Sequence, residues 1–303
     1  MDHPLRSDTN KSLRKRITSL LKHGYAIQRQ SNIVFVCGGN DPGHMRRRFQ
    51  DEFDNLMPGF EFFEPEFAMK NYFTLGDTTP FDIAEFEKLV AELSHSIVIF
   101  PEAPGSIAET GYFSAIPEIR SKVLLAIDLK RQKSDSFISL GPAKRIADES
   151  MFHPNIQFDY ENPDFSIIAD RLKQRAPLHK IKKALTIKSF ADTPTLELFA
   201  LINGLVDLLL IATAQDIEFF LRSLYESHIS PSKMKKIISI LVGSKRLIEI
   251  GEYGHLRASN TKAPFLSLKD GKKTTHDVLR IDISTELLAS DKDFLSVLDG
   301  SGK

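Results

Sequence analysis

The stretch of sequence that most constrains the fold is residues 97–112, which read IVIFPEAPGSIAETGY. The first four residues are apolar, a pattern typical of a strand buried on both faces of a parallel sheet. Gly105 and Ser106 then suit a tight turn and a helix N-cap, whose backbone N–H groups can face an anion. Glu109 follows inside the first turns of the predicted helix. Because open α/β sheets bind ligands at the carboxyl ends of their strands, the segment predicts a carboxylate placed to act on a sugar carbon.

The same alternation of strand and helix runs through the first half of the chain. Apolar runs predict strands at 32–37, 60–63, 96–100 and 122–127. Amphipathic patterns predict helices at 7–23, 46–57, 81–93, 110–119 and 136–146, the first of them capped by Ser7 or Asp8. Strands that alternate with helices indicate an α/β fold with a doubly wound parallel sheet and right-handed crossovers. We assign this domain to residues 1–165.

The second half, residues 166–303, has a different pattern. Helices are predicted at 164–175, 180–191, 195–212, 214–227 and 232–243. A hairpin with a glycine-bounded turn is predicted at 246–258, and one more strand at 278–283 in a polar tail. Short helices followed by a hairpin are the outline of a winged helix, in which residues 232–243 would be the recognition helix. We therefore expect a mostly helical, winged-helix-like C-terminal domain.

Composition limits the compartment and the cofactors. Cys37 is the only cysteine among 303 residues, which excludes an internal disulfide and is typical of a reducing environment. No apolar run has the length of a transmembrane helix, and the polar N-terminus does not resemble a secretory signal. No Cys/His cluster has the spacing of a zinc site. We expect a cytoplasmic protein with no bound metal and no membrane contact.

The formal net charge is zero, but the charges are segregated along the chain. Residues 31–110 hold fourteen acidic and five basic residues. Basic residues outnumber acidic ones by seven to two in residues 1–30, seven to one in 165–190 and seven to two in 231–262. Basic segments of this kind mark contact with phosphates of nucleic acid, or else solvated helix faces. Both readings remain open from the sequence.

Four segments are expected to meet at the carboxyl ends of the first three strands: the Gly38-Gly39 loop, residues 64–66, Glu102 and residues 105–111. Gly38-Gly39 is either a phosphate or ribose cradle or only a turn, and at most two of the arginines at 46–48 can reach one site. Glu102 either binds a ribose hydroxyl or caps a turn, and Glu87 either faces the site or faces solvent.

Glu109 has the strongest claim to a chemical role among these residues. A carboxylate in the first turns of a helix also complements the helix dipole, and that effect alone would explain an acidic residue there. It does not explain Gly105-Ser106 before Glu109 or Gly111 after it, which thin out the side chains around the carboxylate. The glycines and the serine therefore favour a catalytic reading.

These residues carry a family resemblance. Residues 105–112 resemble the G-[ST]-x-x-E-x-G-x motif of nucleoside 2-deoxyribosyltransferases, in which the Glu attacks the anomeric carbon of the sugar. Residues 34–39, 63–66, 97–113 and 122–145 are similar to the effectors of bacterial retrons, anti-phage systems built from a reverse transcriptase and its hybrid RNA–DNA product. Those effectors combine a deoxyribosyltransferase-like domain with a winged-helix-like domain.

The resemblance implies cleavage of the N-glycosidic bond of NAD, with release of nicotinamide and toxic depletion of the NAD pool. It implies that NAD is a substrate, that no cofactor is needed, and that hydrolysis is favoured over transfer, because the residues around the base pocket depart from the transferases. Glu109 is the implied catalytic residue. The implied substrate-binding residues are Cys37, Gly38, Gly39, Glu66, Glu87, Glu102, Gly105 and Ser106.

The resemblance also implies partners for the basic second half. These are the retron reverse transcriptase and its multicopy single-stranded DNA (msDNA) with RNA, in a higher-order assembly that controls the effector. The side chains expected to contact phosphates are Lys233, Lys235, Lys236, Lys245 and Arg246.

Two other functions remain open from the residues alone. The first is a nucleotide sensor or DNA-binding regulator without turnover, in which the acidic pocket only recognises its ligand. The second is hydrolysis of a nucleoside monophosphate, as in related phosphoribohydrolases. Consumption of NAD separates the sensor from the enzyme, and a panel of nucleotides separates the two hydrolases.

Overall fold

The computed structural model of the chain describes residues 3–29, 31–66, 68–69, 82–128, 130, 135–185, 187–226, 228–251 and 254–290. Contacts between Cα atoms divide the chain into two compact units. We call residues 31–64 and 82–179 the sheet unit, and residues 1–30, 65–81 and 180–303 the helical unit. This division differs from the predicted boundary after residue 165, because the N-terminal segment pairs with strands from the second half and the helix at 166–175 packs on the parallel sheet.

The sheet unit is built on five parallel strands. They are β2 (Ile33–Cys37), β3 (Glu61–Phe63), β4 (Ser96–Ile99), β5 (Val123–Asp128) and β6 (Ile156–Phe158). Their order across the sheet is β3-β2-β4-β5-β6, and each neighbouring pair is parallel. The chain therefore moves outward from β2 in one direction to β3 and then in the other to β4. The β2/β4 edge is the topological switch point, where doubly wound sheets bind ligands.

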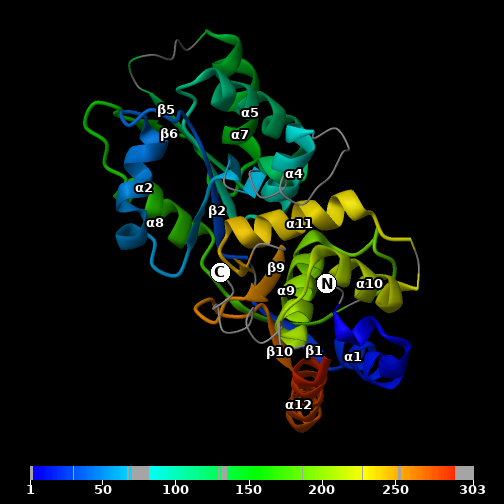
Figure 1. Cartoon of the computed structure of the whole chain (residues 1–303). Coiled ribbons are helices and arrows are strands. Elements are labelled where there is room, and N and C mark those ends of the chain that lie inside the picture. The colour runs from blue at the N-terminus through cyan, green and yellow to red at the C-terminus, as the bar shows by residue number, and fades with distance from the viewer. Residues whose placement is uncertain are drawn as a thin grey trace. The chain divides into compact units, whose positions relative to one another are not determined.

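Helices cover both faces of this sheet, as Figure 1 shows. The helices are α2 (Met45–Leu56), α4 (Ile83–Leu93), α5 (Pro104–Ala115), α6 (Pro117–Arg120), α7 (Lys144–Glu149), which continues the π-helical segment η3 (Ser139–Ala143), and α8 (Ser166–Arg175). Val34, Val36 and Phe100 form one core with Phe49 of α2 and Leu172 of α8. Since successive strand residues alternate between faces, the neighbours of Val34 and Val36 in β2 point to the other face of the sheet.

The opposite face of the sheet packs on α4 and α5. Phe35 of β2 contacts Phe113 of α5 edge to face, with ring centroids 5.9 Å apart. Cys37 lies two residues after Phe35 and so shares its face of the sheet. The apolar runs of β2, β4 and β5 are fully buried, which confirms the predicted parallel strands at these positions.

The helical unit contains α1 (Lys11–His23), preceded by the turns η1 (Pro4–Arg6) and η2 (Asp8–Asn10), and α9 (Thr195–Leu209), α10 (Ala214–Tyr225), α11 (Pro231–Gly243) and α12 (Lys273–Ser290). Strands β10 (Leu266–Leu268), β1 (Tyr25–Arg29) and β7 (Lys180–Ala184) form an antiparallel sheet in that order. The hairpin of β8 (Leu247–Ile250) and β9 (His255–Ala258) confirms the prediction at 246–258. Ala212 adds an antiparallel bridge to Leu256 of this hairpin.

Three sequence-based assignments in this unit need correction. The helix predicted at 180–191 is wrong, because Lys180–Ala184 pairs with β1 as a strand and none of the described residues from 185 to 191 is helical. The strand predicted at 278–283 is wrong, because Leu279, Ile283 and Leu287 recur at helical spacing and are buried on one face of α12. The first helix begins at Lys11 rather than Ser7, because Ser7 caps the turn η2 instead.

None of the helices within the described ranges is long and apolar enough to cross a lipid bilayer.

Candidate active site at the β2/β4 switch point

The candidate site lies where β2 and β4 end side by side. Cys37 and Ile99 are paired in the parallel register, so the loops that follow both strands start at the same edge of the sheet. The β2–α2 loop contains Gly38 and Gly39, and the β4–α5 turn contains Glu102. The sequence predicted this convergence.

Glu109 approaches the sheet from α5. It lies four residues before Phe113, which packs on Phe35, and residues four apart share one helix face. The Cys37 thiol donates a hydrogen bond to the Glu109 carboxylate, and Glu87 of α4 acts electrostatically on the same thiol. The structure thus brings together three of the predicted site residues, from β2, α4 and α5.

The environment of Cys37 keeps its thiol protonated. Burial raises the pKa of the Cys37 thiol well above its ordinary value, and the negative charges of Glu109 and Glu87 raise it further. A neutral thiol remains a hydrogen-bond donor and is a weak nucleophile. Cys37 is therefore placed to orient Glu109 rather than to react.

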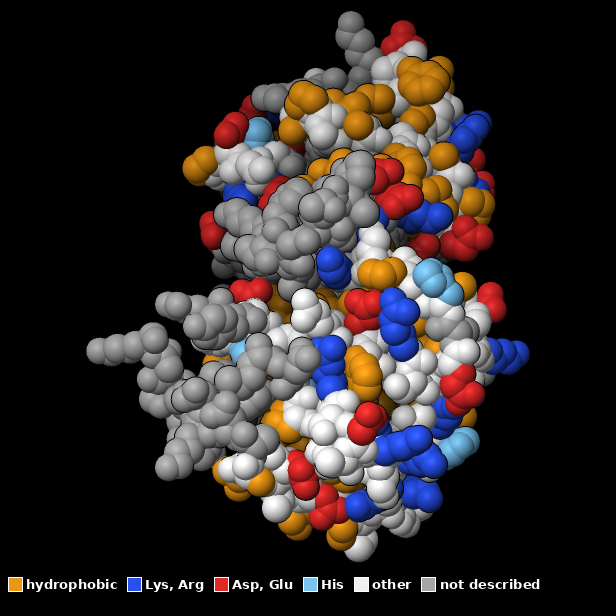
Figure 2. Space-filling model, turned by 45° about the vertical axis from the view of Figure 1, so that its right-hand side comes forward, with side chains coloured by type: hydrophobic (Ala, Val, Ile, Leu, Met, Phe, Trp, Pro, Cys, Tyr) orange, Lys and Arg blue, Asp and Glu red, His pale blue; other side chains and the backbone are white. Residues whose placement is uncertain are grey.

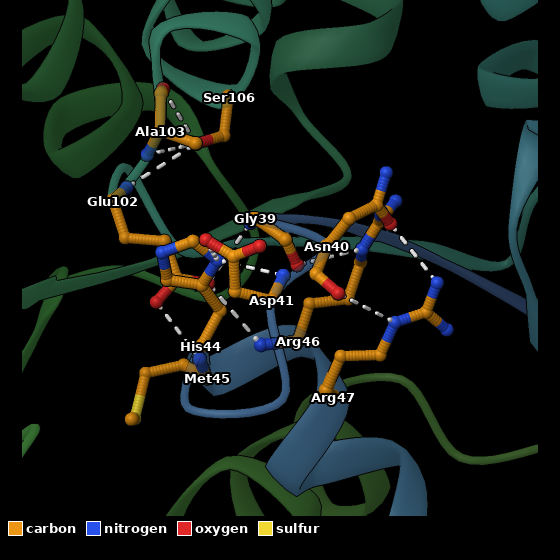
Figure 3. A network of polar contacts seen from close by, with 10 residues as sticks. All are labelled: Gly39, Asn40, Asp41, His44, Met45, Arg46, Arg47, Glu102, Ala103 and Ser106. Atoms are coloured by element: carbon orange, nitrogen blue, oxygen red, sulfur yellow. Dashed lines mark hydrogen bonds and ion pairs between the residues drawn. The ribbon is translucent and has the colours of Figure 1, made fainter.

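Glu102 forms the densest polar network at this edge, drawn in Figure 3. Its Oε1 accepts the backbone N–H groups of Gly39 at 3.0 Å and Arg46 at 3.3 Å, and its Oε2 accepts that of Met45 at 2.8 Å. The carboxylate thus joins the β2–α2 loop to the N-terminus of α2, where helix amides and the helix dipole favour an anion.

The arginines that follow the loop also bind protein groups. Arg46 is buried; it donates to the carbonyl of Gly39 at 3.3 Å and to the Asn40 side chain. Arg47 donates to Glu64 at 2.8 Å and to Asn40 at 2.9 Å. Asn40 is a loop residue that the sequence analysis did not single out. A polar residue directly after the glycines and before a run of arginines was the available signal.

Neighbouring side chains leave no room for a Cβ atom at either loop glycine. A Cβ on Gly38 would lie 2.6 Å from Cβ of Arg46 and 2.8 Å from Oε1 of Glu102. A Cβ on Gly39 would lie 2.0 Å from Nδ1 of His44, a nitrogen that accepts the backbone N–H of Asp41 at 3.1 Å. The glycines therefore make room for the protein's own side chains.

Gly105 and Ser106 differ in position from the prediction, which placed them in the turn and at the N-cap. The helix α5 begins at Pro104, a residue favoured in a first turn because its missing N–H needs no partner there. Ser106 is buried, and its Oγ accepts the N–H groups of Ala103 at 3.1 Å and Glu102 at 3.2 Å. Its hydroxyl thus holds the β4–α5 turn.

Gly111 lies inside α5, two residues after Glu109, and a Cβ there would meet no atom within 4 Å. Because glycine in a helix interior costs about 0.5–1 kcal/mol relative to alanine, Gly111→Ala should raise the free energy of unfolding by about that amount. Denaturant unfolding measures the change. A variant less stable than wild type would contradict the open space described at this position.

The other nominated residues lie in the helical unit. Glu66 is assigned to that unit and follows the end of β3 by three residues. Arg246 is 1% exposed; its Cζ lies 4.1 Å from the Phe265 ring centroid, and its guanidinium donates to the carbonyl of Ala263. Arg246 is therefore not one of the exposed cations that the sequence predicted. Lys236 is also buried, whereas Lys245 is exposed.

The helix α11 is less accessible than a recognition helix should be. Seven of its thirteen residues are buried, including Lys236. Lys233 and Lys235 are partly exposed, and Lys233 lies over the Phe190 ring at 6.0 Å. Because a recognition helix presents an open face to the groove, the exposed lysines here are better suited to phosphates than to base edges.

Within the described ranges, no group of three or more His, Cys, Asp or Glu side chains is arranged to hold a metal ion.

Comparison with known proteins identifies the family. The family model described as STM3845 retron effector protein matches residues 42–249, more than half of the chain. The chain belongs to this retron effector family. The match includes Glu87, Glu102 and Glu109, and it begins after the Gly38-Gly39 loop.

Two curated proteins of Escherichia coli are similar to this retron effector. One, from retron Ec86, is 31% identical over 142 residues, which are 46% of this chain and 45% of the relative. The other, from retron Ec73, is 26% identical over 121 residues, 39% of this chain and 38% of the relative. Both names describe a ribosyltransferase/DNA-binding protein. The aligned parts span less than half of each relative.

Proposed function

We propose that this retron effector cleaves the N-glycosidic bond of a nucleotide, with NAD as the substrate and Glu109 acting at the anomeric carbon. The observation that carries the proposal is the Glu109 carboxylate, which accepts a hydrogen bond from the buried Cys37 thiol at the switch point of the sheet. Membership of the retron effector family and relatives named for ribosyl transfer support the same reaction class.

The reaction needs one carboxylate at C1′ of the ribose. In NAD the bond to nicotinamide ends on a cationic nitrogen, so its electron pair returns to that nitrogen and neutral nicotinamide leaves without a general acid. Glu109 either bonds to C1′ as a glycosyl-enzyme ester or stabilises the oxocarbenium-like transition state by its charge. Water then supplies the hydroxyl at C1′ and gives its second proton to solvent, leaving ADP-ribose.

The substrate contacts are assigned from the groups that surround Glu109 and from the first turn of α5. Glu87 faces the same thiol as Glu109 and is assigned to the ribose hydroxyls. The N–H of Gly39 binds Glu102, so we place the pyrophosphate at the first turn of α5 rather than on the Gly38-Gly39 loop. The first N–H groups of a helix have no intrahelical partner, and Gly105 in that turn has no atom within 4 Å of a Cβ position.

A panel of substrates tests the proposal. Purified protein is incubated separately with NAD, nucleoside monophosphates and 2′-deoxynucleosides, and free bases are separated by chromatography. We expect nicotinamide and ADP-ribose from NAD. Base released only from a monophosphate would favour the phosphoribohydrolase reading, whereas thermal stabilisation by NAD without products would favour the sensor.

We further propose that the basic surfaces of the helical unit hold the retron reverse transcriptase and its RNA–DNA product, in an assembly that restrains the enzyme. On α1, Lys11 and Lys15 are exposed. Figure 2 shows Lys and Arg side chains grouped at the lower right of the view. The two relatives named for DNA binding support this role, and the half-buried α11 favours contact with phosphates over sequence reading.

Reversing the charge at Lys233 and Lys245 together should weaken binding of a short single-stranded DNA by about tenfold. It should also reduce the salt dependence of binding, because fewer counterions are released when fewer phosphates are contacted. Fluorescence anisotropy at several salt concentrations measures both quantities. A matched control reverses Lys88 and Lys144, two exposed lysines of the sheet unit. Equal weakening in both double variants would show that only net charge matters.

A further inference from the structure

The two loops at the switch point are joined by a single residue. The Glu102 side chain accepts three backbone N–H groups from Gly39, Met45 and Arg46, all within 3.3 Å. These donors come from the start of the β2–α2 loop and from the first turn of α2 (Figure 3). A carboxylate at a helix N-terminus gains from charge-assisted hydrogen bonds and from the helix dipole together.

The main chain of the same residue is tied to α5. The backbone N–H of Glu102 donates to Oγ of Ser106 at 3.2 Å, and that of Ala103 donates to the same oxygen at 3.1 Å. Ser106 in turn donates to the carbonyl of Ala103 at 3.0 Å. The helix that carries Glu109 is therefore connected through Glu102 to the loop that follows Cys37.

The loop glycine is fitted to this carboxylate. A Cβ on Gly38 would lie 2.8 Å from Oε1 of Glu102, closer than any real contact of a Cβ atom. The absence of a side chain at Gly38 thus lets the carboxylate enter the loop and reach the amide of Gly39.

We propose that Glu102 is a positioning residue, a built-in anion that holds the β2–α2 loop and the β4–α5 turn together and so places Glu109 against Cys37. This inference rests on the proposed role of Glu109 in catalysis. It assigns Glu102 to the protein's own amides rather than to a ribose hydroxyl. It also means that a substrate phosphate on the Gly39 and Met45 amides has to displace Glu102 first.

Removal of the anion gives the first test. In Glu102→Ala, loosened loops should lower kcat for base release by about 100-fold, the cost of misplacing a reacting group by about 1 Å, while KM changes much less. Glu102→Gln keeps the shape but turns an amide toward N–H donors, so it should lose activity too. Glu118→Ala, at an exposed glutamate of α6 in the same unit, is the matched control and should match wild type.

Formate provides the second test, because it can take the place of the missing carboxylate. Added sodium formate should raise both kcat and the melting temperature of Glu102→Ala and leave the wild type unchanged. A variant with normal kcat and raised KM would overturn the proposal, because that result identifies a substrate contact. A melting temperature of Glu102→Ala that formate does not change would also overturn it. If wild type releases no base from any nucleotide, the proposed reaction fails, but the melting test of Glu102 still stands.

Discussion

Glu109→Gln should lower the rate of nicotinamide release by about a thousandfold or more, because it removes the group that acts on the anomeric carbon in the rate-determining step. The amide is nearly the same size, and it can still accept the hydrogen bond that the Cys37 thiol donates. The melting temperature should therefore stay close to that of wild type. Initial rates under saturating NAD, with the melting curve of the same sample, measure both.

A matched control separates this effect from a general loss of negative charge. Glu92 lies near the end of α4, in the same unit but away from the β2/β4 edge, and is exposed. Glu92→Gln changes the net charge by the same amount and should keep full activity. Nicotinamide release by Glu109→Gln at the wild-type rate would remove Glu109 from the mechanism.

Gly38→Ala should destabilise the protein by about 1–3 kcal/mol, the usual cost of overpacking a filled site. The new Cβ would lie 2.6 Å from Cβ of Arg46 and 3.5 Å from its Cα. This clash is relieved only if the first turn of α2 moves. The same movement pulls amides away from Glu102, so base release should fall as well. Denaturant unfolding gives the change in free energy.

Gly105→Ala is the matched control for that substitution. Gly105 also lies at the edge of the site, in the first turn of α5, but a Cβ there would meet no atom within 4 Å. Its free energy of unfolding should change by less than about 0.5 kcal/mol, as for other unobstructed surface substitutions. A stable Gly38→Ala protein would contradict the packing described for this loop.

The parallel sheet could be predicted from the sequence because its signals are local. Residues 33–37, 96–99 and 123–128 are short apolar runs followed by turn residues, and all are buried in the structure. Helices 45–56 and 83–93 carry one apolar face each, which packing on the sheet requires. The order of the strands was not predicted, although their parallel direction was.

The sheet of the helical unit was harder to predict from the sequence, because its strands come from distant segments of the chain. Lys180–Ala184 has lysines and apolar residues that suit a strand or a helix, and its pairing with β1 lies more than 150 residues away in the sequence. β1 itself was missed, since it follows α1 with a single glycine between them. In residues 278–283 a local alternation of apolar and polar residues concealed the longer helical period of α12.

At the candidate site, sequence reasoning found the residues more readily than their roles. Glu109 stood out because glycines and a serine surround it, and in the structure both Glu109 and Glu87 act on the Cys37 thiol. Glu102 was predicted either to bind a ribose hydroxyl or to cap a turn, and its oxygens accept three backbone N–H groups. Only the pairing of β2 with β4 brings Glu102 to the α2 N-terminus, and that pairing joins segments more than 60 residues apart.

The most direct test of the central claim is turnover of NAD by the purified chain, followed together with its melting temperature. We predict that wild type releases nicotinamide and ADP-ribose in equal amounts and well beyond one equivalent per chain. Glu109→Gln should release both products at least about a thousandfold more slowly, while NAD still raises its melting temperature. The contrary result is NAD that wild-type protein binds, with a rise in melting temperature, but leaves intact.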